Sequence, residues 1–331
     1  MNGKEEVMAV FKRARSFWEA RILMTAAELD IFSFLLDSPK MAAQVSEELS
    51  SDLRGTEILL NALAALELLV KEEEAFRVKP GLEQSLSSFT PETILPLLQH
   101  MAYLWKAWGN LTEIVLKGRK EDAPAHYDRS EKSIEAFIGA MHTIGREMAK
   151  SVISRLDLSG YKNLIDVGGG SGVYTIAMLR SAPWMHATIF DLPPVVKLAR
   201  KRLVNENLID RVTLVKGDFY KDILPGGHDL ALLSAIMHQN SPEQNVELYR
   251  KIHNSLLPGG TLVIRDYIMS KDQTKPVEGA LFAMNMLVTT PGGNTYSFND
   301  FKEDLEAAGF ASIRLLHQAE MDSLVTAQKP H

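Results

Sequence analysis

Hydrophobic and polar positions follow distinct patterns along this chain of 331 residues. Over residues 1 to about 37, apolar side chains recur every three or four positions, which predicts a long amphipathic helix. Residues 91–158 show the same spacing in several segments, which predicts further helices. From residue 159 onward, short apolar runs alternate with helical stretches, and this alternation predicts parallel strands joined by helices in a doubly wound α/β sheet.

The segment between the first two patterns predicts two helices and a hairpin. MAAQVSEELS is expected to form a short helix, Asp52 to cap a second helix over Leu53–Val70, and KEEEAFRVKP to form a small β-ribbon. This order is typical of a winged helix, which often binds DNA. The second helix, however, carries one Arg and no Lys, and phosphate binding requires basic side chains. We therefore expect no nucleic-acid partner.

The N-terminal helix has more apolar surface than a solvated helix needs. Ala9, Phe11, Phe17, Ala20 and Leu23 lie at helical spacing. Two explanations account for this apolar surface: it packs inside its own domain, or it forms the interface between two copies of the chain. The sequence leaves both open.

Composition narrows the class of protein. The chain is 46% hydrophobic and 24% charged with a net charge of −6, as expected for a globular protein without an anionic membrane or nucleic acid as its main partner. It has no cysteine, so disulfides and thiolate metal sites are excluded, and no metal site is predicted. No apolar run approaches the ~20 residues of a membrane span, and the N-terminus lacks a signal-peptide core, so a cytoplasmic location is expected.

A glycine-rich turn lies at the centre of the predicted sheet. A buried strand over residues 163–167 runs directly into Gly168, Gly170 and Gly172, and a helix follows. Glycines allow the backbone to approach a ligand, and the free N–H groups at the helix start can face it. Asp191 ends the next strand, where a carboxylate can accept hydrogen bonds from both hydroxyls of a ribose.

The glycine spacing indicates which nucleoside is bound. A dinucleotide site would require a glycine at position 173, where the chain has Val173. The phrases DVGGGSG and FDLPPVV instead resemble class I S-adenosylmethionine-dependent methyltransferases of the caffeate and hydroxyindole O-methyltransferase type. This resemblance implies a Rossmann-like methyltransferase sheet with an N-terminal all-helical, winged-helix-like dimerisation domain, a homodimer, and a small-molecule acceptor.

The predicted domains are 1–90 for dimerisation, 91–158 as helices that wall the acceptor pocket, and 159–331 for S-adenosylmethionine binding. Asp218 and Phe219 follow the third strand and suit an adenine. The Asp218 carboxylate could accept a hydrogen bond from the adenine amine, and the Phe219 side chain could pack against the face of the adenine ring. The predicted cofactor site comprises Asp166, Gly168, Gly170, Gly172, Asp191, Leu192, Asp218, Phe219 and Ser234. The predicted acceptor pocket comprises Met141, His142, Asn285 and Met286.

His238 is the candidate general base. It is expected at the end of a strand spanning Asp229–Met237, beside Asp266 on the neighbouring strand end, and an unprotonated imidazole can accept a proton at pH 7. The segment LLSAIMHQNSPEQ resembles the family segment with the catalytic histidine, but Gln239-Asn240 replace the usual Asp-Trp. A second acid that flanks the histidine in the family is replaced by Thr295.

These observations predict an S-adenosylmethionine-dependent methyltransferase that acts on the oxygen of a small aromatic or polycyclic hydroxyl. Because one of the two acids is missing, an acceptor with another nucleophile such as sulfur, or a protein of this fold without methyl transfer, remains open. A winged-helix regulator that senses a ligand and a nicotinamide oxidoreductase are further alternatives. The acidic second helix argues against the regulator, and Val173 against the oxidoreductase.

Overall fold

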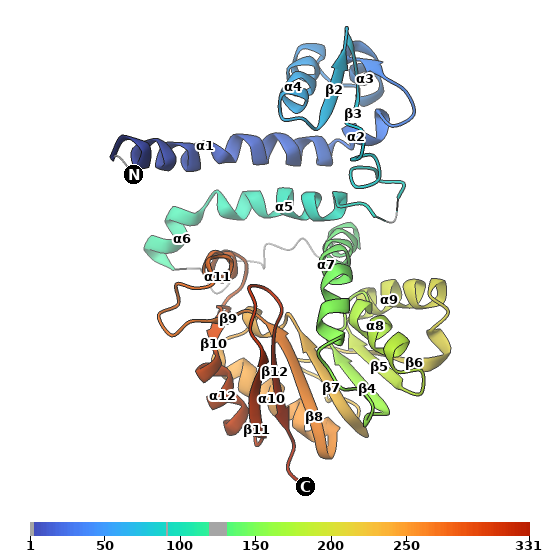
Figure 1. The fold of residues 1–331 in the computed structure, drawn as a ribbon, viewed down its shortest axis with the longest axis vertical. Coiled ribbons are helices and arrows are strands. Elements are labelled where there is room, and N and C mark those ends of the chain that lie inside the picture. The colour runs from blue at the N-terminus through green and yellow to red at the C-terminus, as the bar shows by residue number, and fades with distance from the viewer. Residues whose placement is uncertain (1–2, 91, 119–130) are drawn as a thin grey trace. The chain divides into compact units, whose positions relative to one another are not determined.

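A computed structural model describes residues 3–90, 92–118 and 131–331 of the chain. The chain divides into two compact units, Met1–Lys106 and Ala107–His331 (Figure 1). The boundary between them falls inside the helical region predicted for residues 91–158, of which residues 91 and 119–130 lie outside the described part. None of the described helices is long and apolar enough to cross a membrane.

The first unit consists of helices packed around one small sheet. The strands pair antiparallel in the order β1-β3-β2, with the β2–β3 hairpin at the position predicted for the wing. The helices and strands are α1 Gly3–Glu28, α2 Ile31–Phe34, β1 Lys40–Met41, α3 Ala42–Leu49, α4 Leu53–Ala65, β2 Leu69–Glu72, β3 Ala75–Val78 and most of α5 Leu95–Trp108.

Three expectations for this unit need correction, and the predicted cap of α4 is confirmed, as is the hairpin. The unit is not all-helical, because it contains the three-stranded sheet. The helix expected over residues 53–70 ends at Ala65, since Glu67 adopts a left-handed φ of 58° and the apolar run beyond it joins β2. The helix expected to about residue 37 is interrupted at Asp30, where φ is 50°. Asp52 caps α4 as predicted, with the Gly55 N–H donating to its side chain at 2.7 Å.

The second unit is a three-layer α/β structure built on a seven-stranded sheet. The strand order is β11-β12-β8-β7-β4-β5-β6, with all neighbours parallel except β12, which is antiparallel to both β8 and β11. The elements are α6 Leu111–Lys117, α7 Glu131–Ile153, β4 Asn163–Val167, α8 Val173–Ser181, β5 His186–Asp191, α9 Pro193–Asn205, η1 Ile209–Arg211, β6 Val212–Lys216, β7 His228–Ser234, η2 Met237–Gln239, α10 Pro242–Ser255, β8 Leu256–Asp266, β9 Ile268–Met269, α11 Val277–Thr289, β10 Tyr296–Ser297, α12 Phe298–Ala307, β11 Ala311–His317 and β12 Ser323–Gln328.

Helices cover the sheet on both faces, so its central strands are apolar on both sides. On one face, Ile165, Leu262 and Ile264 pack with residues of α10 and α12, including Tyr249 and Leu305. On the other, alternate strand residues pack against α7, α8 and α9; they include Leu164, Leu230, Leu232 and Val263. The order of the strands changes side at β4, because β5 and β6 lie on one side of it and β7 and β8 on the other. Ligands bind at such a point in doubly wound sheets.

Candidate active site

The three predicted glycines of the turn after β4 all adopt left-handed backbone conformations. Gly168, Gly170 and Gly172 have φ values of 68°, 55° and 77°, which side chains with a Cβ rarely tolerate. A Cβ at Gly168 would also lie 2.7 Å from the Ile236 side chain, which comes from the loop after β7. The turn is therefore shaped by its glycines and is packed closely against the end of β7.

Asp191, at the end of β5, is bound to this turn. One carboxylate oxygen accepts the Gly170 N–H at 2.8 Å, and the other accepts the Leu192 N–H at 2.7 Å. Each oxygen keeps a lone pair for a further donor. Burial raises the pKa of Asp191 to about 6, although both backbone bonds favour its charged form.

Asp166 supports the turn from the α8 side of the sheet. It is 2% exposed, and its carboxylate accepts the Thr175 hydroxyl at 2.6 Å. Burial raises its pKa to about 7, the Thr175 hydrogen bond opposes this rise, and the nearby Asp191 charge adds to it. The side chain of Asp166 is thus directed to α8, and its predicted contact with the cofactor stays a prediction.

The loop after β6 brings Phe219 to the same turn. Its ring lies 3.4 Å from the point where a Gly168 Cβ would be. The neighbouring Asp218 accepts the Tyr220 N–H at 3.0 Å and forms an ion pair with Lys221 at 3.2 Å. Phe219 therefore adjoins the glycine turn, as an adenine-facing residue must, and the predicted roles of both residues stay predictions.

His238 and Asp266 meet as the sequence predicted. The imidazole Nδ1 lies 2.8 Å from the Asp266 carboxylate, and the two side chains are 13% and 2% exposed. With Nδ1–H donating to Asp266, Nε2 is the nitrogen that can accept a proton. The predicted strand end was wrong, however, because β7 ends at Ser234 and His238 lies in the short turn η2. Ala235 adopts a left-handed φ of 57° and ends the strand early.

Backbone donors hold the Asp266 carboxylate in place. It accepts the Met237 N–H at 3.1 Å and the Tyr267 N–H at 2.8 Å in addition to the His238 ring. Burial alone would raise the pKa of Asp266, but the His238 charge and hydrogen bond, Arg265 and the Tyr267 N–H lower it overall. Asp266 is therefore an ionised, fixed acceptor that orients the imidazole.

Two contacts of His238 were missed from the sequence. The Phe282 ring on α11 meets the imidazole edge-on, with ring centroids 4.7 Å apart, and stacks on Tyr267 at 4.8 Å. Gly293 approaches so closely that a Cβ would lie 2.4 Å from the His238 carbonyl oxygen. Phe282 lies one helical turn before Met286, and Gly293 is in the Pro-Gly-Gly segment, so both are near residues singled out in the sequence, but neither position indicated a contact with His238.

Two of the residues that depart from the family pattern, Asn240 and Thr295, are buried and hydrogen-bonded. The Thr295 hydroxyl donates to the Gly279 carbonyl at 3.2 Å and supplies no charge near His238. Asn240 accepts the Tyr220 hydroxyl at 2.5 Å through its side chain and the Tyr296 hydroxyl through its backbone. This polar network supports η2 where the family has Asp-Trp.

The predicted acceptor-pocket residues occupy different environments. His142 on α7 lies 3.1 Å from the Ser171 hydroxyl in the glycine turn, and burial, with Arg202 and Arg146 nearby, lowers its pKa to about 4. Asn285 accepts the Trp108 indole N–H at 3.0 Å. Met286 is buried and Met141 is half-buried. Their roles toward an acceptor stay predictions, and His142 is closer to the cofactor turn than expected.

These features indicate an α/β protein that binds a nucleoside cofactor and has a candidate proton acceptor beside it. The features are a glycine turn after the first strand of a doubly wound sheet, a carboxylate at the end of the second strand, and a histidine–aspartate pair at the same edge.

The chain belongs to the O-methyltransferase family. A model of the O-methyltransferase domain matches residues 108–311, and one of the O-methyltransferase dimerisation domain matches residues 11–81. The chain is 31% identical over 316 residues to the 3-hydroxy-5-methyl-1-naphthoate 3-O-methyltransferase of Streptomyces sahachiroi, covering 92% of this chain and 90% of that protein. It is 28% identical to the N,N-dimethyltransferase OxyT of Streptomyces rimosus over 98% of this chain and 97% of that protein.

A solved relative has the same fold over nearly the whole chain. The structure of human N-acetylserotonin methyltransferase in complex with SAM superposes with a TM-score of 0.86 at 25% identity, covering 98% of both chains. These comparisons confirm the predicted fold class, family and enzyme class, and S-adenosylmethionine as the cofactor of the family. They favour a methyltransferase over the regulator and the oxidoreductase.

Proposed function

We propose that this protein transfers a methyl group from S-adenosylmethionine to the hydroxyl of a small aromatic or polycyclic acceptor, with His238 as general base. The observation that carries the proposal is the hydrogen-bonded pair of His238 and Asp266 at the sheet edge that also holds the glycine turn. The naphthoate relative supports an aromatic hydroxyl as the acceptor.

The residues of the turn fit the cofactor. The close approach of the Gly168 backbone to Ile236 leaves no space for side chains, and the buried Asp191 presents acceptors suited to a ribose. Phe219 would face the adenine. When bound, S-adenosylmethionine supplies an electrophilic methyl group on a sulfonium.

The chain's own residues would prepare the nucleophile. His238 Nε2 removes the acceptor's hydroxyl proton, while Asp266 fixes the ring and stabilises its charged form. Phe282 contacts the imidazole edge-on and is itself stacked on Tyr267, which gives His238 an apolar neighbour on α11. An acceptor bound beside these rings would be partly desolvated, and this raises the reactivity of its oxyanion. Residues of α7 and α11, with Met141 and Asn285 among them, line the acceptor pocket in this proposal.

A nucleophile other than oxygen is the second candidate. With Thr295 in place of the second acid, Asp266 is the one carboxylate that contacts the imidazole among the described residues, and the relative OxyT is an N,N-dimethyltransferase. An amine or thiol that is already nucleophilic would need less help from a base.

A screen with isotopically labelled S-adenosylmethionine tests the proposal directly. Phenolic acceptors should gain label, and matched aromatic amines and thiols should gain less. Label on amines or thiols alone would favour the second candidate, and no label on any acceptor despite tight cofactor binding would indicate a protein of this fold without methyl transfer.

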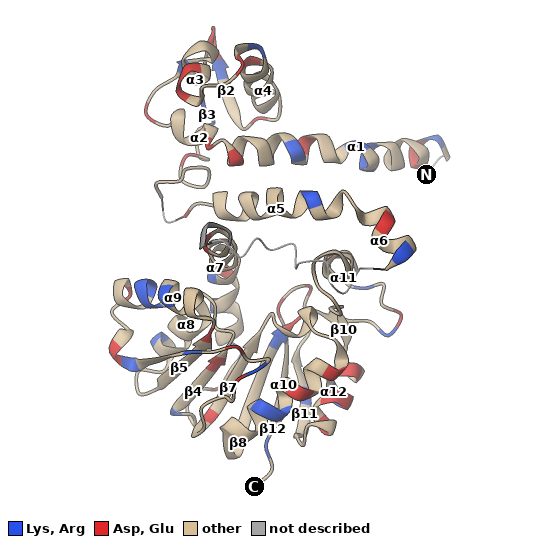
Figure 2. Cartoon of the chain, turned by 180° about the vertical axis from the view of Figure 1, so that it is seen from behind, with Lys and Arg blue, Asp and Glu red and all other residues tan. Residues whose placement is uncertain are grey.

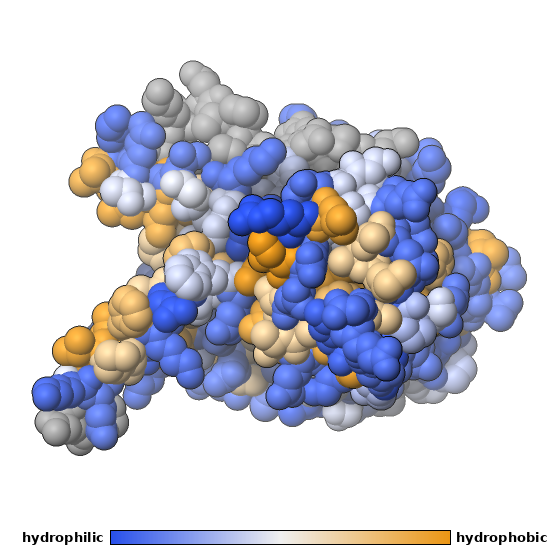
Figure 3. Space-filling view, turned by 90° about the horizontal axis from the view of Figure 1, so that it is seen from above, coloured by the Kyte–Doolittle hydropathy of each residue, from blue (hydrophilic) through white to orange (hydrophobic). Residues whose placement is uncertain are grey.

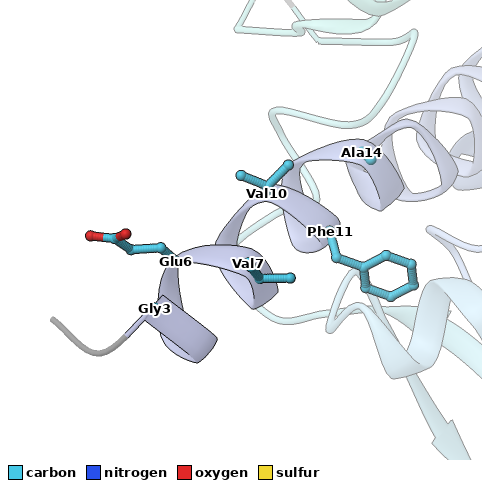
Figure 4. Close-up of a pocket in the computed structure, with 6 residues that line it drawn as sticks. All are labelled: Gly3, Glu6, Val7, Val10, Phe11 and Ala14. Carbon is cyan, nitrogen blue, oxygen red and sulfur yellow. The ribbon is translucent and has the colours of Figure 1, made fainter.

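We also propose that the chain is a homodimer through residues 1–90 and does not bind nucleic acid. Six large apolar side chains of α1 are exposed, and Figure 3 shows hydrophobic residues on the surface beside the N-terminus; the six are Val7, Met8, Val10, Phe11, Phe17 and Trp18. A shallow hollow of about 470 Å³ on this helix is lined by Gly3, Glu6, Val7, Val10, Phe11 and Ala14 (Figure 4).

The winged-helix-like part of the unit is not basic, which argues against nucleic acid as a partner. Charges on α3 and α4 are of both signs (Figure 2), and this does not suit a phosphate backbone.

Light scattering should therefore give a particle of about twice 36.9 kDa at micromolar concentration. Val10→Glu places a charge on the apolar face and should shift the mass toward 36.9 kDa, because a buried unpaired charge destabilises an interface. Ser16→Glu adds the same charge on the opposite face of α1 and should leave the dimer intact. A wild-type mass of 36.9 kDa would refute the dimer.

A further inference from the structure

Arg265 is a buried cation that forms no ion pair with any residue in the described part of the chain. It is 7% exposed near the end of β8 and shares its face of the sheet with Val263, toward α7 and α8. Asp266, the next residue, points to the opposite face, where it is occupied by His238 and backbone N–H groups. Among the described residues, no carboxylate forms an ion pair with Arg265.

The contacts that Arg265 does make are weak. One terminal nitrogen lies 2.8 Å from the thioether sulfur of Met148, and the guanidinium lies 6.0 Å from the centre of the Tyr174 ring. Its Nε has no partner among the described atoms. A guanidinium has five donors, and leaving a buried charge without an acceptor costs free energy.

Arg211 in the same unit shows what a structural arginine looks like here. Its side chain donates to the backbone carbonyls of Leu179, Ala182 and Met185 at 2.6–3.1 Å. Among the described residues Arg265 has no comparable set of acceptors, so the hydrogen bonds of that part of the chain do not explain its burial.

Two hydroxyls beside Arg265 are also unsatisfied. The Tyr174 and Ser234 oxygens are buried and have no hydrogen-bond partner among the described residues. Ser234 is opposite Arg265 in the β7–β8 register. The Ser234 hydroxyl is close enough to Tyr174 to influence the pKa of the phenol, but the two hydroxyls do not form a hydrogen bond of normal geometry. Burial raises the pKa of Tyr174, so its phenol is protonated and can donate a hydrogen bond.

The cluster is next to the cofactor turn. Tyr174 is the second residue of α8, directly after Gly172 and Val173, and Ser234 is the last residue of β7. A guanidinium and two hydroxyl donors therefore converge at the carboxyl edge of the sheet, on the face opposite the His238–Asp266 pair.

We propose that Arg265, Tyr174 and Ser234 form a binding site for a carboxylate of a bound ligand. A carboxylate neutralises the buried charge and accepts two parallel N–H bonds from a guanidinium, whereas a water molecule cannot neutralise it. This inference rests on the proposed function, which supplies two sources for the carboxylate. One is the amino-acid end of the cofactor, and the other is an acidic group on the acceptor.

Calorimetry on the full chain separates the sources. S-adenosylhomocysteine has the amino-acid carboxylate, and 5′-methylthioadenosine is the same nucleoside thioether without it. If the cofactor is the source, Arg265→Met should weaken S-adenosylhomocysteine binding by ~10-fold or more and change 5′-methylthioadenosine binding by less than ~3-fold. If the acceptor is the source, both affinities stay unchanged, and KM rises by ~10-fold for a carboxylated acceptor but not for its neutral amide.

Arg211→Met is the matched control. It should lower the melting temperature without changing the affinity for S-adenosylhomocysteine relative to 5′-methylthioadenosine, or the KM of the carboxylated acceptor relative to its amide. The same result for Arg265→Met, a lower melting temperature and no selective loss, would overturn the proposal. If Arg265→Met does not fold, Tyr174→Phe and Ser234→Ala should show the same selective pattern at ~2–10-fold, and its absence in both would also overturn it. Failure of the wild-type chain to bind S-adenosylhomocysteine would instead contradict the proposed function.

Discussion

His238→Ala is expected to lower turnover by ~10²–10⁴-fold and to leave cofactor affinity nearly unchanged. The imidazole is held by Asp266 at 2.8 Å and contacts Phe282, whereas the residues proposed for the cofactor lie at the glycine turn. Removing the ring therefore takes away the proton acceptor and leaves the cofactor site intact. Turnover measured at saturating cofactor and acceptor, with calorimetry of S-adenosylhomocysteine, tests both parts.

A matched control uses His186, an exposed histidine at the start of β5. His186→Ala should keep full turnover. The competing view is that His238 only shapes the pocket and the acceptor ionises unaided. That view predicts a small loss for His238→Ala and a rate that follows the acceptor's own acidity across a series of phenols. Full activity of His238→Ala with a weakly acidic phenol would end the general-base hypothesis.

Asp266→Asn is a less direct test than the sequence alone indicated. Orientation of the ring is only part of what Asp266 does, because it also accepts the Met237 and Tyr267 N–H groups. An amide NH₂ in that place would face backbone donors, so the variant loses stability together with ring orientation. His238→Ala separates the chemistry from folding more cleanly.

The parts of the site that lie at strand ends could be predicted from the sequence. Gly168, Gly170, Gly172 and Asp191 follow strands that are recognisable as short apolar runs, and the sheet brings such ends to one edge. The same reasoning placed Asp266 next to His238. Local patterns were sufficient because parallel strands align their carboxyl ends.

Contacts that depend on tertiary packing could not be predicted. Nothing in the local sequence of Phe282 or Gly293 states that they meet His238, because α11 and the loop after it are folded back by long-range contacts. Arg265 looked like an ordinary strand-end residue until the alternation of β8 placed it on the face away from Asp266. The apolar run after Ala65 was compatible with helix and strand, and Glu67 decided between them.

Asp191→Ala is expected to weaken binding of S-adenosylhomocysteine by ~10–100-fold, because hydrogen bonds to a charged acceptor contribute about 1.5–3 kcal/mol. The loss has two origins in the structure. The variant removes the acceptor for the ribose, and it frees the Gly170 N–H that Asp191 holds at 2.8 Å. Asp210→Asn, at an exposed acid in η1 at the other edge of the sheet, is the control and should bind normally.

The pH dependence of this binding distinguishes Asp191 from other acids. Because the pKa of Asp191 is raised to about 6 in the ligand-free protein and ribose hydroxyls favour the charged carboxylate, affinity should be full above pH 6. It should fall as pH drops through that value, by up to ~10-fold per pH unit, since protonation turns one acceptor into a donor. Asp166, whose pKa is about 7, is the nearest confounding group, so Asp166→Asn should keep the dependence and Asp191→Ala should abolish it. An unchanged pH profile in Asp191→Ala would show that Asp191 does not hold the cofactor.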